Sequence, residues 1–167
     1  MAAVSVTPLE RELHLIDVEN LIGTPYFTAA AVRALRSAYN CVSQAATGAL
    51  QVIGTSAASN VLIAALAWGS ARPVFENGPD GADRALLAAG EFAPERRFGR
   101  IVIGSGDHVF AFYAADLQSK GVEVTVVCRP EALSRKLLLA VNDVRYLPHI
   151  DSGPTAPASH GALGRVA

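Results

Sequence analysis

The chain is expected to form one α/β domain, a three-layer α/β/α sandwich around a mostly parallel sheet of five or six strands. Short apolar runs alternate along the 167 residues with segments that carry apolar residues at helical spacing. Several runs are apolar on both faces, as expected for parallel strands covered by helices on both sides. Because 51% of the residues are hydrophobic, the chain can bury a substantial core.

The elements follow one another in the order strand, helix, strand. The predicted strands are residues 13–17, 50–54, 72–75, 100–104 and 122–127, with 143–147 as either a sixth strand or an extended cover. The predicted helices are residues 28–44, 55–68, 82–92, 108–119 and 130–140, the last with Pro130 in its first turn. Residues 1–12 are expected to be a lead-in, 13–147 the folded domain and 148–167 a disordered tail.

The second predicted helix and the strand after it carry specific expectations. Thr55 and Ser56 are natural N-cap residues for the helix that ends at Trp68. Its apolar face, formed by Val61, Leu62 and Leu66, is expected in the core. Pro73 favours an edge position for the third strand, since proline cannot donate a hydrogen bond to a neighbouring strand.

Composition narrows the class of protein. The net charge of −1 excludes a generally basic surface that coats nucleic acid, although a local basic patch is compatible with it. The longest apolar run, residues 61–68, is too short to span a bilayer, and no signal peptide pattern begins the chain. A cytoplasmic location without membrane contact is therefore expected. Cys41 and Cys128 have no CxxC partner and are expected to be buried free thiols.

Three aspartates follow predicted strands. Asp17 ends the first, Asp107 follows the fourth, and Asp83 lies in the first turn of the helix after the third. If the first and fourth strands are neighbours where the winding reverses, Asp17 and Asp107 meet about 4.8 Å apart at the ligand-binding edge. Carboxylates this close repel each other unless a proton or a cation lies between them.

The oxygen ligands at this edge favour a hard cation. With Asn20 and Ser105 nearby, the three aspartates form a set without thiolates, which selects Mg²⁺ or Mn²⁺. A purely structural alternative remains, in which Asp17 and Asp107 cap the following helices and Asp83 interacts favourably with a helix dipole.

Three segments resemble the ordered motifs of NYN domains, PIN-like nucleases related to the LabA-type proteins. The segments are residues 16–21 (IDVENL), 81–86 (GADRAL) and 104–107 (GSGD). The resemblance covers residues 13–147. It implies a PIN-like sandwich and a Mg²⁺- or Mn²⁺-dependent ribonuclease, with metal ligands at Asp17, Asp83 and Asp107 and with Asn20 in the site.

The chain departs from this family at two positions. Val109, preceded by His108, stands where members often carry a second acid, and Ala88 stands where another acid is often found. The acidic set is therefore thinner than in an active nuclease. The alternative is a catalytically degenerate PIN-like module that binds RNA or another protein.

RNA is the expected partner, single-stranded or structured, and a homodimer is left open. An acidic centre repels the RNA backbone, so binding needs nearby cations. Arg84 and Arg129 are the candidate phosphate contacts, while Asn20 and Ser105 would orient ligands or phosphate. A second group of cations, expected to be solvated at the opposite edge of the sheet, comprises Arg96, Arg97 and Arg100.

Two other classes of enzyme fit less well. A haloacid-dehalogenase-type phosphatase needs an aspartate two residues after the first, where this chain has Glu19. A dinucleotide-binding Rossmann domain needs G-x-G-x-x-G after the first strand, and that motif is absent.

Overall fold

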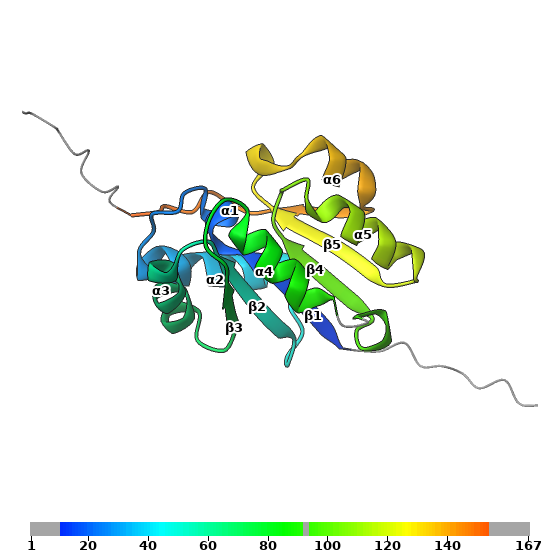
Figure 1. The fold of residues 1–167 in the computed structure, drawn as a ribbon, viewed down its shortest axis with the longest axis horizontal. Coiled ribbons are helices and arrows are strands. Elements are labelled where there is room, and N and C mark those ends of the chain that lie inside the picture. The colour runs from blue at the N-terminus through cyan, green and yellow to red at the C-terminus, as the bar shows by residue number, and fades with distance from the viewer. Residues whose placement is uncertain (1–10, 92–93, 154–167) are drawn as a thin grey trace, which may run out of the picture.

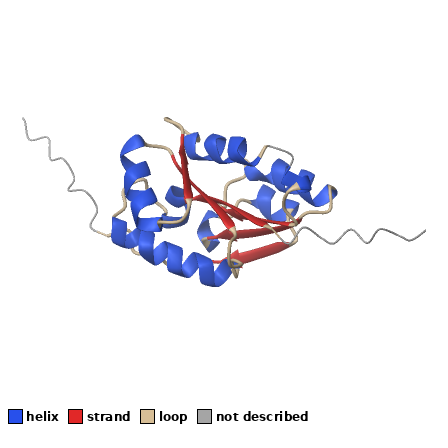
Figure 2. Ribbon diagram, turned by 90° about the horizontal axis from the view of Figure 1, so that it is seen from below, coloured by secondary structure: helices blue, strands red, loops and turns tan. Residues whose placement is uncertain are grey.

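The computed structural model describes residues 11–91 and 94–153, which fold around one parallel sheet of six strands (Figure 1). The strands are β1 (Glu12–Asp17), β2 (Leu50–Thr55), β3 (Arg72–Phe75), β4 (Arg100–Gly104), β5 (Glu123–Cys128) and β6 (Asp143–Tyr146). The helices are α1 (Val18–Ile22), α2 (Ala29–Ser43), α3 (Ala58–Trp68), α4 (Gly81–Gly90), α5 (Phe110–Ser119) and α6 (Arg135–Ala140). Helices cover both faces of the sheet, which confirms the predicted three-layer α/β/α architecture (Figure 2).

The winding of the sheet reverses at β1. The strand order is β3-β2-β1-β4-β5-β6, and every neighbouring pair is parallel. Ile16 of β1 pairs with Gly104 of β4, while Asp17 pairs with Gly54 of β2. The first and fourth strands are therefore neighbours, as predicted, and the loops that follow them start from the same carboxyl edge.

The central strands are buried because helices cover both of their faces. In Figure 1, α4 and α5 lie in front of the sheet and α2 lies behind it. Leu15 and Ile16 of β1 and Ile101 and Ile103 of β4 are completely inaccessible to solvent. By contrast, β3 is an exposed edge strand, the position that Pro73 predicted.

The start of α3 differs from the prediction. The N-cap residue is Ala57, and it makes no side-chain capping bond. Instead the carboxylate of Glu19, from α1, accepts hydrogen bonds from the Ser56 backbone N–H, the Ser56 hydroxyl and the Asn60 amide. A tertiary contact thus replaces the local cap, and a carboxylate at a helix N-terminus is favoured by the helix dipole.

The predicted core face of α3 is wrong for Leu62 and Leu66, while Val61 is partly buried. Leu62 and Leu66 are 65% and 76% exposed, whereas Ala64, Ala67 and Trp68 are buried. The Trp68 indole packs inward and donates to the Gln51 side chain at 2.8 Å. Since this large ring and the small alanines fill the space above the sheet, the leucines are left on the solvent side.

The segment after β5 also differs from the prediction. Pro130–Ala132 forms only a short 3₁₀ helix, and α6 starts later, behind Ser134. The Ser134 hydroxyl accepts a hydrogen bond from the Leu137 N–H at 3.2 Å, so this serine is the N-cap. Residues 143–146 then form a sixth strand, which decides between the two predicted alternatives in favour of the strand.

The segment after β6 packs against the rest of the domain. Beyond β6, Ile150 is buried and the Ser152 carbonyl accepts a hydrogen bond from the Thr28 N–H. The expected tail falls partly on residues 154–167 and the expected lead-in on residues 1–10, both outside the described residues. None of the helices in the described ranges is long and apolar enough to cross a membrane.

Both cysteines are free thiols, as predicted, but only one is buried. Cys128 ends β5 inside the core, whereas Cys41 is exposed on α2. The expectation of burial is wrong for Cys41 because this position lies on the polar side of an amphipathic helix.

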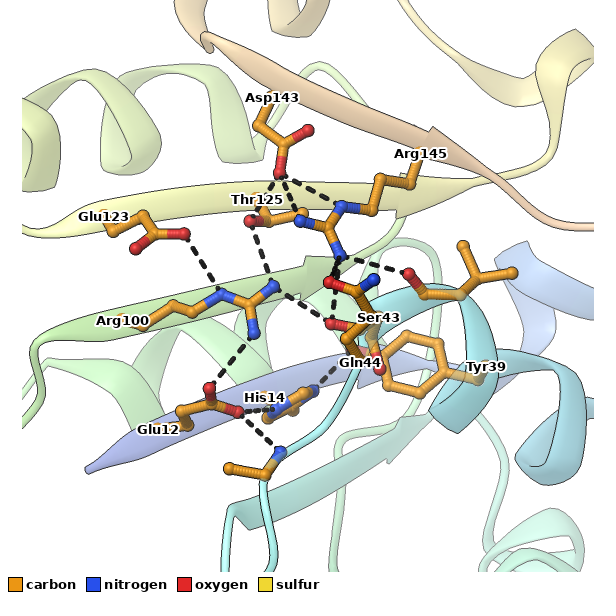
Figure 3. A network of polar contacts seen from close by, with 12 residues as sticks. Glu12, His14, Tyr39, Ser43, Gln44, Arg100, Glu123, Thr125, Asp143 and Arg145 are labelled. Carbon is orange, nitrogen blue, oxygen red and sulfur yellow. Dashed lines mark hydrogen bonds and ion pairs between the residues drawn. The ribbon is translucent and has the colours of Figure 1, made fainter. Parts of the chain in front are cut away.

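A polar network joins the strands at the amino edge of the sheet (Figure 3). The Arg100 guanidinium donates to Glu12 and to the Ser43 carbonyl, at 3.1 and 2.9 Å. The other Glu12 carboxylate oxygen contacts the buried His14 ring, which also bonds to the Tyr39 hydroxyl. Arg100 therefore lies at the predicted edge, but with its side chain only 14% exposed it is not a solvated charge.

Replacing Arg100 with alanine is expected to destabilise the fold by about 1–3 kcal/mol, because Glu12 and the Ser43 carbonyl would lose a charged partner in a poorly solvated place. The matched control is Arg96→Ala at an exposed position, expected to change stability by about 0.5 kcal/mol or less. Urea unfolding of the three proteins measures both effects. Equal midpoints for the two variants would contradict the structural role of the network.

Candidate functional site

Asp17 is a buried carboxylate at the carboxyl edge. It ends β1 and is the N-cap of α1, where Oδ1 accepts the Asn20 N–H at 3.0 Å. The residue is only 6% exposed. The capping role expected from the sequence is thus present, but one capping bond is little compensation for removing a carboxylate from water.

Asp83 approaches Asp17 from α4, and Gly54 makes this approach possible. A Cβ at Gly54 would lie 2.7 Å from Leu86 Cγ and 3.2 Å from the Ala82 carbonyl oxygen, so only glycine lets α4 pack this closely on β2. Asp83 is 6% exposed, and its Oδ1 is buried without a hydrogen-bond partner among the described residues.

The two buried aspartates hold protons more tightly than ordinary carboxyl groups do. Burial, with the neighbouring Asp83 carboxylate, raises the pKa of Asp17 to about 8. Burial, with the charge of Asp107, raises the pKa of Asp83 to about 6. The pair therefore retains a proton near neutral pH, and a proton on Asp17 can be shared with Asp83.

Asp107 lies beside this pair on the more open side of the site. Its side chain is 33% exposed, and Oδ1 contacts the His108 ring at 2.8 Å and the Val109 N–H at 3.0 Å. The hydroxyl of the buried Ser105 accepts the Asp107 N–H at 3.2 Å. Ser105 thus shapes the loop that presents Asp107 and is itself inaccessible to solvent.

Asn20 connects the loops that follow β1 and β4. Its side-chain oxygen accepts the Gly106 N–H at 3.1 Å, and its backbone carbonyl accepts Nε of Arg129 at 3.0 Å. Gly106 is required here, since a Cβ would lie 2.3 Å from the Ala132 carbonyl oxygen. Asn20 is therefore a bridge that fixes the positions of Asp17 and Asp107 relative to each other.

Arg129 borders an open cleft of about 400 Å³, which is also lined by Glu19, Asn20, Gly23, Thr24, Pro25 and Ser56. The guanidinium also donates to Glu131 at 2.6 Å. That partner was not foreseen, although an acid two residues after the arginine in the Arg-Pro-Glu segment is a usable signal. The guanidinium lies against Gly23 and the Asn20 carbonyl at the α1 side of the carboxyl edge, and its role as a phosphate contact stays a prediction.

Arg84 has a different environment from the one expected. Its guanidinium bonds to the Glu76 carboxylate at 2.6 Å and to the Pro79 carbonyl at 2.7 Å. These bonds hold together the loop that leads into α4. The Arg84 side chain is 47% exposed, so a ligand could reach it, but its charge is already paired with Glu76. Two further cations, Arg135 and Lys136, are exposed on α6.

Two further acids lie near the pair, since, besides burial, the charge of Glu19 helps to raise the pKa of Asp17 and the charge of Asp80 that of Asp83. Glu19 is committed to the start of α3 through Ser56 and Asn60, so it holds the wall of the cleft. Asp80 adopts a left-handed backbone conformation, with φ of 55°, at the turn before α4, a conformation that aspartate tolerates in turns such as Gly-Pro-Asp-Gly.

The donor set at the edge matches a hard cation in part. Asp17 and Asp83 supply two adjacent carboxyl groups, and the unpartnered Oδ1 of Asp83 is an open acceptor. Within residues 11–91 and 94–153, however, no three or more His, Cys, Asp or Glu side chains are placed to hold a metal ion. Completing such a site would require Asp107 to leave His108 and join the pair.

The pKa values predict how stability depends on pH. Because the folded-state pKa of Asp17 is raised, its contribution to stability is fully present below the ordinary aspartate pKa and is lost as the pH rises through about 8. Asp17→Asn keeps an N-cap residue without the charge. We expect the melting temperature to fall more steeply between pH 5 and 9 in the wild type than in this variant.

The matched control for this pH series is Asp151→Asn at an exposed position. Its melting temperature should follow the wild-type curve at every pH. If Asp17→Asn also follows that curve, the buried aspartate pair does not bind a proton as the structure indicates.

Comparison with known proteins supports the fold alone. No protein-family model and no curated protein matches the chain. A crystal structure of a protein of unknown function from Vibrio parahaemolyticus aligns with a TM-score of 0.55 and 18% sequence identity. The alignment covers 86% of this chain and 96% of that protein, so the two share an overall architecture across nearly the whole domain.

Proposed function

We propose that this protein is a Mg²⁺- or Mn²⁺-dependent endoribonuclease of the NYN/PIN-like type, which hydrolyses RNA phosphodiesters at the carboxyl edge of its sheet. The observation that carries the proposal is the buried pair of Asp17 and Asp83, with raised pKa values, beside Asp107. Such clusters of perturbed carboxyl groups are typical of functional sites. The proposal includes a cytoplasmic location and RNA as the partner.

Fold stability gives little reason to keep this pair. Asp17 could cap α1 without Asp83, and Asp83 Oδ1 has no hydrogen-bond partner in the described chain. Two carboxyl groups buried next to each other are unfavourable unless a proton or cation is bound. A functional requirement for the pair explains why this arrangement is present.

Asp17, Asp83 and Asp107 would hold the divalent ion. When bound, the ion would supply an activated water and stabilise the charge that develops on the phosphodiester. Asn20 keeps the β1 and β4 loops in register through Gly106, so that the carboxyl groups stay close. Ser105 holds the Asp107 loop in place.

Binding of RNA to this acidic edge requires positive charge. Arg129 is the best-placed cation because it lies on the cleft beside Asn20. Arg84 would reach a phosphate only by exchanging its Glu76 partner. Arginine suits this task, since its planar guanidinium can bind two phosphate oxygens at once.

The second candidate is a catalytically degenerate PIN-like module that binds RNA or a protein. Two observations favour it: Val109 stands where the family often has an acid, and Asp107 is paired with His108. An apolar side chain at position 109 could not support a second metal ion. If the site does act as a nuclease, slow or specialised turnover is therefore expected.

Cleavage of a labelled single-stranded RNA tests the proposal. The wild type should cut the RNA with Mn²⁺ and stop when a chelator is added, whereas Asp17→Asn should lose at least about 100-fold in rate because the metal-binding carboxylate is gone. Val109→Asp is expected to have a higher kcat than the wild type at saturating RNA, because an added carboxylate can support a second metal ion. If the wild type binds RNA in the presence of chelator and never cuts it, the protein is a binding module and the nuclease proposal fails.

Metal binding can be measured separately from cleavage. Isothermal titration should detect Mn²⁺ binding to the wild type at pH 8, and binding at least about tenfold weaker to Asp83→Asn, since an amide lacks the negative charge. Asp151→Asn should bind Mn²⁺ like the wild type. Equal binding by Asp83→Asn would remove Asp83 from the ligand set.

A further inference from the structure

A groove between α4 and α5 begins at the candidate site. It has a volume of about 260 Å³ and is lined by Leu87, Glu91, Val109, Phe112, Tyr113 and Asp116. In Figure 1 the two helices lie side by side on the front face of the sheet. The Tyr113 hydroxyl donates to the Gly90 carbonyl at 3.1 Å, which fixes one wall of the groove to the other.

The groove starts next to the residues that carry the aspartates. Val109 lines it, and the Val109 N–H donates to Asp107 Oδ1 at 3.0 Å. On α4, Leu87 is four residues after Asp83 and therefore lies one turn further along the same helical face. A chain bound with a phosphodiester at the aspartates would thus place an adjacent group in this groove.

Phe112 is unusual for a helix that covers a sheet. It is 84% exposed, although a phenyl ring in this position is costly to leave in water. Of the two acidic residues of the groove, Asp116 is paired with Lys120 at 2.7 Å, and Glu91 would repel a phosphate. A flat ring without charge suits the groove better than the sugar-phosphate backbone does.

We propose that Phe112 stacks on an unpaired nucleobase of single-stranded RNA, with Val109 and Leu87 as the apolar floor of the same subsite. This inference rests on the proposed function and names how its substrate is held. An exposed aromatic ring can stack on any base, so the contact selects unpaired RNA without selecting a sequence. Val109, which weakens the acidic set, gains a role as a binding residue.

Binding of fluorescein-labelled single-stranded RNA, measured by anisotropy in chelator, tests the subsite without cleavage. Phe112→Ala should weaken binding about 5- to 50-fold, in line with the loss of one stacked base. Phe112→Trp should bind like the wild type, and its added fluorescence should be quenched by RNA above the constant signal of the buried Trp68. An abasic residue at the stacked position should abolish the difference between wild type and Phe112→Ala.

The matched control is Leu66→Ala, which removes another exposed apolar side chain, on α3, and should leave RNA affinity unchanged. Equal affinities of wild type and Phe112→Ala would overturn the inference. So would a wild-type dimer that Phe112→Ala converts to monomer with no change in RNA affinity, because the groove would then join two copies of the chain.

These outcomes are distinct from failure of the nuclease. If the wild type never cuts RNA but Phe112→Ala weakens binding, the stacking subsite stands and the catalytic proposal fails. If the wild type cuts RNA and Phe112→Ala has unchanged binding and kcat/KM, the nuclease stands and the subsite fails.

Discussion

The parallel pairing of β1 with β4 is the constraint on which the rest of the carboxyl edge depends. Since Ile16 pairs with Gly104, the chain leaves both strands at the same level and in the same direction. Asn20 can therefore reach Gly106, and Asp107 comes close enough to raise the pKa of Asp83. A shift in this register would separate the two loops and with them the aspartates.

The two edges of the sheet differ in how their charged side chains are paired. At the amino edge, Glu12 meets Arg100 and has its pKa lowered by hydrogen bonds, although burial opposes this. At the carboxyl edge, Asp17 meets Asp83, and burial raises both pKa values. The first arrangement stabilises the fold with opposite charges, while the second retains a proton that a cation could displace. This contrast locates the candidate site more firmly than any single motif.

Two glycines make the carboxyl edge compact, because each stands where another part of the chain comes very close to the backbone. Gly54 lets α4 descend onto β2, and Gly106 lets the β4 loop pass the Ala132 carbonyl. Both positions lie beside the aspartates, although neither supplies a ligand. The geometry of the site thus depends on residues without side chains as much as on the acids, which links packing of the backbone to the chemistry that we propose.

The sequence by itself determined the alternation of strands and helices and the position of Asp17, Asp83 and Asp107 after predicted strands, because apolar periodicity is a local property. The neighbouring positions of β1 and β4, on which the meeting of these aspartates depends, became certain only in the folded sheet. Tertiary structure alone decided which polar partners meet. In the folded molecule Glu19 caps the start of α3, and Leu62 and Leu66 face solvent. Arg100 is largely buried among acids and carbonyls. Such contacts join residues far apart in the chain, so no local pattern encodes them. Their energies depend on burial, which only the packed molecule defines.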